Sequence, residues 1–437
     1  MPSPAPEPLA SRPLSVWLVN PFDDIPGEGL PPLRYWTLAR VLAARGHDVI
    51  WWTATWSHRR KAIRSAPLGI REDEGFAVRL VAVRPYEKNV SLARLGSHRD
   101  FGRTFERLAN ESISSGQLER PDIILASLPP LDSPEAAARL ARKVDATFVL
   151  DVQDLWPETF DRLIPGPAFL KRFIAPLLLG GMQKRRKALL GAADAVSAAT
   201  RTYANAVLQD APAELPRHVC YVGAYPQEFP APPRHVNHVP VPDAGEAEPA
   251  PEAAVLECVY AGTLEAGQDL DVLAGAGRQL SAAGVQATIH VAGSGTGEAA
   301  LRRAAASLVG SCRLVVHGLL QRPAYVSLLS RCHVGLVCVK PDSLVAVPNK
   351  ACDYAAAGLA IVNSLPGELQ GLIDEHAAGV AYTAGDASSL ARAIGGFAAD
   401  RSRLTACRQG ARRLAAAEFD RERTYPKFAD WLETVSG

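Results

Sequence analysis

The sequence has no Cys-x-x-Cys pair, although its 437 residues include seven cysteines. An odd number of cysteines without paired spacing argues against both a disulfide framework and a zinc site. His235 and His238 have a metal-like spacing, but they lie in a proline-rich segment without an accompanying set of cysteines or carboxylates. We therefore expect no metal and no cofactor. We expect free thiols, buried in a protein of the reducing cytoplasm, at Cys220, Cys258, Cys312, Cys332, Cys338, Cys352 and Cys407.

The chain also lacks a charge excess, a long apolar run and a recognisable secretory leader. The formal net charge is +1, which gives no electrostatic reason to expect a nucleic-acid partner. The longest apolar segment, FIAPLLLGGM at 173–182, is too short to span a bilayer. The proline-rich start, PSPAPEPLASRP, does not read as a signal peptide. The basic run QKRRKALL at 183–190 indicates a solvated helix face, with peripheral contact to an anionic membrane as the alternative.

Apolar strand-like runs alternate with amphipathic helical segments along the chain, and 48% of the residues are hydrophobic. Runs that are apolar throughout indicate parallel sheets covered by helices on both faces, an α/β fold. In the first half these runs lie at 15–20, 47–53, 77–83, 122–127, 147–152 and 194–200. In the second half they lie at 256–262, 288–293, 313–318, 334–339, 359–364 and 379–383.

A change of composition separates the two halves. Residues 226–254 hold many prolines and little periodicity, which indicates a linker or a long exposed loop. We expect an N-terminal Rossmann-like domain over 1–225 and a second over 255–414, with ligands at the carboxyl ends of the strands in a cleft between them. One long helix is expected over about 403–434, and the segment from about 415 to 437 should complete the N-terminal domain.

The most informative segment is PNKACDYAAAGLAIV at 348–362. A proline and two polar residues, among them Asn349, open a helix whose N-terminus offers unpaired N–H groups and a partial positive charge to a phosphate. Asp353, one turn later, can accept two hydrogen bonds from a ribose diol. The segment therefore predicts a sugar-nucleotide site.

Glycines follow three of the expected strands. Gly293 and Gly295 stand between a strand and a helix, and Gly262 with Thr263 ends the strand before them. Glycines there allow a backbone to approach a phosphate, although ordinary loop packing explains them as well. Gly27, Glu28 and Gly29 follow the first strand, where we expect contact with an acceptor or a loop that only needs positive φ.

Asp154 follows a buried strand in DVQDLWPETF. A carboxylate at the end of a strand can orient a hydroxyl or accept a proton, so Asp154 is a candidate catalytic residue.

Taken together, these motifs resemble the GT-B-fold retaining glycosyltransferases of family 4, especially the branch that reads D-V-x-D-L-W-P-E. That motif is DVQDLWPE at 151–158, and YAGTLEAGQDL, VAGSGTG, VHGLL, PNKACDYAAAGLAIV and PGELQGLI follow in the family's order. The resemblance covers the chain outside the first dozen residues and the linker.

The resemblance implies roles for single residues and also shows departures. Of the family's two acidic residues eight positions apart, the ribose-binding one is Asp353, and the sugar-contacting one is replaced by Val345. Thr263 stands where many members carry an arginine on the diphosphate, and EAGQDL holds no lysine. Lys350 and the backbone amides of Ala346 and Val347 are then expected to neutralise the diphosphate. The base is expected near His317, Gly318 and Leu319.

The resemblance further implies a metal-independent transfer with retention, in which the departing diphosphate receives the acceptor's proton. Because Val345 replaces an acid, we expect an atypical donor sugar and a small-molecule acceptor, joined through O, N or S, as in antibiotic or other natural-product biosynthesis. Alternatives are a sugar-nucleotide epimerase on the same fold, a silent nucleotide-sugar binding protein, or a dinucleotide enzyme. The sequence gives no expectation for the oligomeric state.

Overall fold

The computed structural model describes residues 12–28, 32–64, 71–73, 75–89, 91–163, 168–212, 214–229, 255–265 and 267–436. The chain forms two compact units. The first unit comprises Met1–Cys220 and Arg423–Gly437, and the second comprises Tyr221–Glu422. His235 and His238, at which no metal site is expected, lie outside the described residues, as does most of the expected linker.

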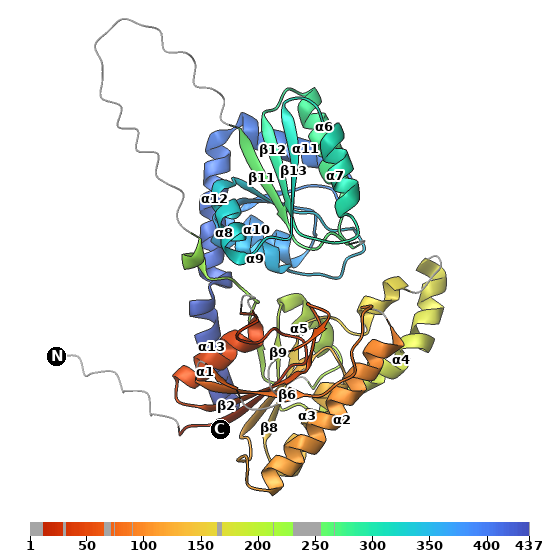
Figure 1. The fold of residues 1–437 in the computed structure, drawn as a ribbon, viewed down its shortest axis with the longest axis vertical. Helices are drawn as coiled ribbons and strands as arrows, with labels where there is room; N and C mark the ends of the chain where they lie inside the picture. The colour runs from red at the N-terminus through yellow and green to blue at the C-terminus, as the bar shows by residue number, and fades with distance from the viewer. Residues whose placement is uncertain are drawn as a thin grey trace, which may run out of the picture. The chain divides into compact units, whose positions relative to one another are not determined.

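The first unit is built on an eight-stranded sheet in the order β10-β9-β8-β7-β1-β2-β6-β5 (Figure 1). Every neighbouring pair is parallel except β5 with β6. The strands are β1 (Ser15–Val19), β2 (Asp48–Ala54), β5 (Arg71–Asp73), β6 (Phe76–Val81), β7 (Ile123–Leu128), β8 (Thr147–Val152), β9 (Ala195–Ala198) and β10 (Arg217–Val219). A short antiparallel pair joins β3 (Trp56–Ser57) to β4 (Ala62–Ile63).

The helices of the first unit include one from the C-terminus of the chain. Tyr425, Phe428 and Leu432 of α13 are fully buried in the same apolar cluster as Val16 and Leu18 of β1. The helices are α1 (Arg34–Ala44), α2 (Leu92–Ser114), α3 (Asp132–Val144), α4 (Ala168–Ala192), α5 (Arg201–Leu208) and α13 (Arg421–Val435), with a 3-10 segment at Glu158–Leu163.

The second unit holds a fully parallel six-stranded sheet in the order β13-β12-β11-β14-β15-β16 (Figure 1). Its strands are β11 (Leu256–Ala261), β12 (Ala287–Ala292), β13 (Cys312–Gly318), β14 (Val334–Val337), β15 (Ala360–Asn363) and β16 (Gly379–Ala381). Its helices are α6 (Asp271–Ala282), α7 (Glu298–Ser307), α8 (Arg322–Arg331), α9 (Asn349–Ala356), α10 (Glu368–His376), α11 (Ala387–Ala399) and α12 (Arg401–Leu414), with a 3-10 turn at Pro226–Glu228.

Both faces of the second sheet are covered, as the apolar runs predict. Alternate residues of β11, β14 and β15 enter one of two clusters: Cys258 and Tyr260 of β11 pack with α6 and α11, and Val259 packs with α9 and α12. Burial of both faces explains why these strands are apolar throughout rather than alternating. The expected α/β fold with two Rossmann-like units is confirmed.

The expected single helix over about 403–434 is wrong. Helix α12 passes into a π-helical turn at Ala415–Phe419, and Asp420 is extended, before α13 begins at Arg421. The cause is a long-range backbone pairing: Ala224 donates to the carbonyl of Phe419 at 2.8 Å, and Arg421 donates to the carbonyl of Ala224 at 3.0 Å. Helical periodicity cannot reveal a break that a distant strand-like segment imposes.

Two further expectations concern the state of the cysteines and the presence of a membrane-spanning helix. All seven cysteines are buried, as expected, and none of them forms a disulfide. Among the described residues, no helix combines the length and apolarity needed to cross a membrane.

Candidate functional site

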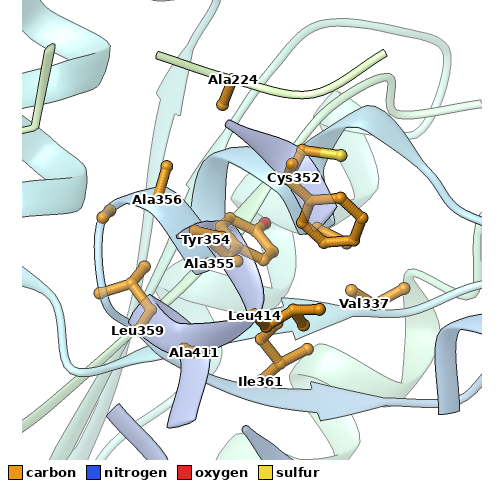
Figure 2. Close-up of a cluster of buried hydrophobic side chains, with 14 of the residues drawn as sticks. Ala224, Val337, Cys352, Tyr354, Ala355, Ala356, Leu359, Ile361, Ala411 and Leu414 are labelled. Carbon is orange, nitrogen blue, oxygen red and sulfur yellow. The ribbon is translucent and has the colours of Figure 1, made fainter. Parts of the chain in front are cut away.

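Helix α9, expected to bind a phosphate, is held in place by Tyr354. The fully buried hydroxyl of Tyr354 accepts a hydrogen bond from the backbone N–H of Ala261 at 2.7 Å and donates to the carbonyl of Leu336 at 3.4 Å. Figure 2 shows the Tyr354 ring within the apolar cluster that also contains Ile361 and Leu414. The helix is thereby tied to the last residue of β11, directly before Gly262.

Two glycines let the loops after β11 and β12 approach each other closely. Gly293 has φ +152°, and a Cβ there would collide with the carbonyl oxygen of Gly262. Gly262 has φ +144°, and a Cβ there would lie 2.9 Å from the Lys350 ammonium. Both positions therefore require glycine, because a side chain would separate the loops or displace the cation.

Lys350 brings its ammonium to these loops. Its Nζ lies 3.9 Å from the centroid of the Tyr260 ring and 3.3 Å from the Oε1 of Gln268. Burial lowers the pKa of Lys350 to about 8. A cation with few polar partners, beside glycine loops and a helix N-terminus, is chemically suited to an anion such as a diphosphate.

Asp353 lies on α9 one turn from its start, and its side chain is 20% exposed. Its Oδ2 accepts a hydrogen bond from the Tyr325 hydroxyl at 2.9 Å and one from Arg322 at 3.4 Å. Arg322 is itself bonded to Glu228 and lies over the Phe229 ring at 5.4 Å. Burial and the nearby Asp353 raise the pKa of Tyr325 well above its ordinary value, so its hydroxyl remains a donor. The carboxylate is thus oriented from one side, with Oδ1 less strongly engaged.

The expected base-binding residues lie where β13 ends. Gly318 has φ +76°, and its carbonyl accepts a hydrogen bond from the N–H of Gly293 at 2.8 Å. Leu319 is 72% exposed. The Nε2 of His317 lies 2.9 Å from the Nδ1 of His290, a partner that the sequence did not reveal. The loop after β13 is therefore joined to the Gly262 and Gly293 loops.

The remaining donor-side candidates differ in exposure. Thr263 and Asn349 are exposed, Val347 is partly buried, and Ala346 is buried. Val345 is 38% exposed and offers no polar side-chain group. Gly295 packs against the carbonyl of Leu264 and shapes the loop between β12 and α7. Among these residues the structure brings Gly262, Gly293 and Lys350 together, and the roles of the others stay predictions.

In the first unit, the expected acceptor loop is held by an ion pair. Gly27 has φ +83°, as a tight loop requires. Glu28 accepts a hydrogen bond from the N–H of Ile25 at 3.0 Å and pairs with the buried Arg64 at 3.1 Å. These bonds give the Glu28 carboxylate a structural task. Gly29 lies outside the described residues.

Asp154, the other catalytic candidate, follows β8 as expected. Its Oδ1 accepts hydrogen bonds from the N–H of Leu155 at 2.8 Å and from the hydroxyl of Thr159 at 3.4 Å. These bonds fix the carboxylate at the carboxyl end of the strand. Its catalytic role stays a prediction.

The DVQDLWPE motif has a structural component that the sequence did not reveal. Asp151 is fully buried and forms a bidentate ion pair with Arg34, which is 1% exposed, at 2.8–3.2 Å. Ser197 and Gln153 also donate to this carboxylate. The first aspartate of the motif therefore joins β8 to α1. The available signal in the sequence was Arg34, a charged residue at the start of the otherwise largely apolar helix RYWTLAR, which needs a buried acidic partner.

Comparison with known families assigns both halves. Residues 33–223 match the glycosyl transferase 4-like domain, and residues 256–400 match the glycosyl transferases group 1 family. Comparison with the curated proteins found no match to this chain.

Solved structures share the fold at low sequence identity. Sucrose-phosphate synthase from Thermosynechococcus elongatus has a TM-score of 0.69 and 16% identity, covering 97% of this chain and 99% of its own. HepE from Anabaena, in complex with UDP-glucose, has a TM-score of 0.62 and 15% identity, covering 96% and 100%. A glycosyltransferase from Rickettsia africae has a TM-score of 0.63 and 13% identity, covering 97% and 99%. With the two domain matches, these similarities identify the chain as a glycosyltransferase of the GT-B fold.

Proposed function

We propose that this glycosyltransferase takes its sugar from a nucleoside diphosphate bound by the second unit. The observation that carries the proposal is the meeting of Lys350, Gly262 and the start of α9 at the carboxyl end of β11. The similarly folded HepE was solved with UDP-glucose and with UDP, which supports a nucleotide-sugar donor.

Different residues of the second unit bind the diphosphate and the ribose of the donor. Lys350 and the backbone amides at the start of α9, with those of Ala346 and Val347, neutralise the diphosphate. Asp353 accepts hydrogen bonds from the ribose, and Tyr325 and Arg322 orient its carboxylate. Gly262, Thr263, Gly293 and Gly295 let the backbone approach the phosphates, and Asn349 lies at the start of the same helix.

The reaction exchanges one bond at the anomeric carbon. The bond from that carbon to the diphosphate oxygen breaks, a bond to the acceptor atom forms, and the acceptor's proton passes to the departing diphosphate on the same face of the sugar. The configuration is retained, and no metal is required when Lys350 and the helix stabilise the leaving group. Asp154 and the Gly27–Gly29 loop of the first unit serve the acceptor.

Val345 directs the proposal for the sugar. A partly exposed valine cannot hydrogen-bond the hydroxyls of an ordinary hexose, so the donor carries an atypical sugar, and its acceptor is a small molecule of natural-product biosynthesis. Seven buried cysteines outside any disulfide fit a cytoplasmic enzyme. The same valine also favours a second candidate, a silent nucleotide-sugar binding protein.

A thermal-shift panel with UDP, GDP, ADP and dTDP tests the donor proposal. A ligand that binds only the folded state raises the melting temperature, and 100-fold saturation adds about 2.7 kcal/mol. We expect a shift with at least one diphosphate, and a smaller shift with the same ligand in Lys350→Gln; no shift with any of the four contradicts the proposal. Product analysis with sugar nucleotides of the diphosphate that binds then distinguishes sugar transfer, epimerisation and silent binding. Efficient transfer from UDP-glucose, UDP-N-acetylglucosamine or GDP-mannose contradicts the atypical donor.

A further inference from the structure

Three side chains form a hydrogen-bonded chain across neighbouring strands of the second sheet. Glu257 of β11 bonds the Nε2 of His290 on β12 at 2.8 Å, and the Nδ1 of His290 bonds the Nε2 of His317 on β13 at 2.9 Å. The two imidazole rings also stack, with centroids 5.1 Å apart and planes at 29°. The chain runs from the start of β11 to the end of β13, where the loop expected to bind the base begins.

The parallel register explains how three strands align these groups. His290 pairs with Val259 of β11 on one side and with Val315 of β13 on the other. Glu257 precedes the first of these partners by two residues, and His317 follows the second by two. Side chains two residues apart share a face of a sheet, which places Glu257 on the face of His290. His317 lies at a register shift between Val316 and Gly318, and its 2.9 Å contact with His290 places it on that face as well.

The chain of bonds fixes the tautomer of each imidazole. A carboxylate can only accept, so the Nε2 of His290 carries the proton that it donates to Glu257. In the tautomer that carries its single proton on Nε2, the Nδ1 of His290 is an acceptor, and the Nε2–H of His317 donates to it. The Nδ1 of His317 is left with a lone pair, and no described residue donates to it. Burial and the adjacent His290 lower the pKa of His317, which keeps its ring neutral.

We propose that the Glu257–His290–His317 chain presents the Nδ1 of His317 as a hydrogen-bond acceptor that selects nucleobases with a ring N–H. Uracil, thymine and guanine carry such a donor on their pairing edge, whereas adenine and cytosine carry an unprotonated ring nitrogen there. The exposed Leu319, two residues on, offers an apolar face on which a base can stack. This inference rests on the proposed nucleotide site and adds the class of base that it takes. Glu257 and His290 are positioning residues, because they act through His317.

Calorimetric titration at about pH 8 with UDP, N3-methyl-UDP and ADP tests the selection. We expect UDP to bind roughly tenfold more tightly than N3-methyl-UDP and ADP, the value of one hydrogen bond left unmade. His317→Phe should bind all three ligands with similar affinity. Glu257→Gln should narrow the difference, because an amide can donate as well as accept and no longer dictates the tautomer. Arg313→Gln, an exposed change on the same strand, serves as the control that keeps the preference.

Imidazole nitrogen chemical shifts provide a readout that a structural role alone would not move. The wild-type protein should show His317 protonated on Nε2, and Glu257→Gln should shift that population toward Nδ1. Equal affinity for UDP and N3-methyl-UDP, or a wild-type His317 protonated on Nδ1, overturns the inference and leaves the nucleotide site intact. Absence of binding by every nucleoside diphosphate instead overturns the proposed function.

Discussion

The ammonium of Lys350 lies 3.9 Å from the centroid of the Tyr260 ring, although the two residues belong to a helix and a strand far apart in the sequence. The Oε1 of Gln268 accepts a hydrogen bond from the ammonium at 3.3 Å, and no carboxylate among the described residues pairs with the cation. The cation–π contact keeps the lysine charged at neutral pH at moderate cost, because the ring face is electron-rich. The charge is thus available for an anionic ligand.

Binding of a nucleoside diphosphate should be coupled to protonation of Lys350. The pKa of Lys350 is lowered to about 8 by burial, and an arriving diphosphate raises it again. We therefore expect affinity to fall as the pH rises above about 8, with proton uptake on binding near pH 8.5. Titration calorimetry in buffers of different ionisation enthalpy measures that uptake.

Lys350→Gln is the matched variant for this prediction, since it keeps a long polar side chain without the titrating charge. It should bind the diphosphate about 10- to 100-fold more weakly and take up no proton from this position. The lowered pKa also makes the folded state prefer the neutral amine, so the wild-type free energy of unfolding should rise between pH 8 and 10.5 more than that of the variant. Identical proton uptake in both proteins would contradict the account.

Asp353 and Tyr325 should act together on the ribose. Asp353→Ala should weaken nucleotide binding by about 1.5–3 kcal/mol, the range for a charged hydrogen bond. Tyr325→Phe removes only the 2.9 Å bond that orients the carboxylate, so a smaller loss of about 0.5–1.5 kcal/mol is expected. Comparing the affinity for a nucleoside diphosphate with that for its 2′,3′-dideoxy analogue shows whether the lost binding energy comes from the ribose hydroxyls. An Asp353→Ala variant that still distinguishes the two ligands fully would remove the ribose assignment.

Tyr354 should determine both stability and the position of α9. Tyr354→Phe leaves the N–H of Ala261 buried without its partner, which should lower the free energy of unfolding by about 1–3 kcal/mol. Gly335→Ala attacks the same contact from β14, because a Cβ there would collide with the Tyr354 ring. We expect it to cost about 1–3 kcal/mol through overpacking. Denaturant titration measures both changes, and wild-type stability of both variants would refute this role for Tyr354.

The two aspartates of DVQDLWPE should separate stability from activity. Asp151→Asn leaves Arg34 buried with one charge unpaired, and about 3–5 kcal/mol of stability should be lost. Asp154→Asn keeps an oxygen that can accept from Leu155, so its stability should change little while sugar transfer slows. Unfolding curves should therefore show a loss of stability for Asp151→Asn but not for Asp154→Asn, and transfer rates should show slower transfer for Asp154→Asn. A fully active Asp154→Asn enzyme would exclude the catalytic role.

The sequence predicts what local pattern determines and misses what distant contacts determine. The central strands β1, β2, β7, β8, β11, β14 and β15 are largely apolar because they are buried on both faces, and their runs locate them. The short edge strand β5 reads Arg-Glu-Asp and shows no such pattern. The break at Asp420 depends on pairing with Ala224, which no local signal records.

The candidate site shows the same division. The start of α9, the glycines and Lys350 are local motifs, and the sequence places them correctly after their strands. The partners of Asp353, Arg322 and Tyr325, come from α8, and Arg322 is in turn bonded to Glu228. The Glu257–His290–His317 chain depends on strand order and register. Residues that act through neighbours on other strands become visible only when the sheet is assembled.

The most direct test of the central claim is a crystal structure of the protein with a bound nucleoside diphosphate, such as UDP. The account predicts a diphosphate within hydrogen-bond distance of the Lys350 ammonium and the first amides of α9, with the ribose hydroxyls on Asp353. A nucleotide bound elsewhere, with Lys350 still resting on Tyr260 and Asp353 bonded only to Tyr325 and Arg322, would contradict it.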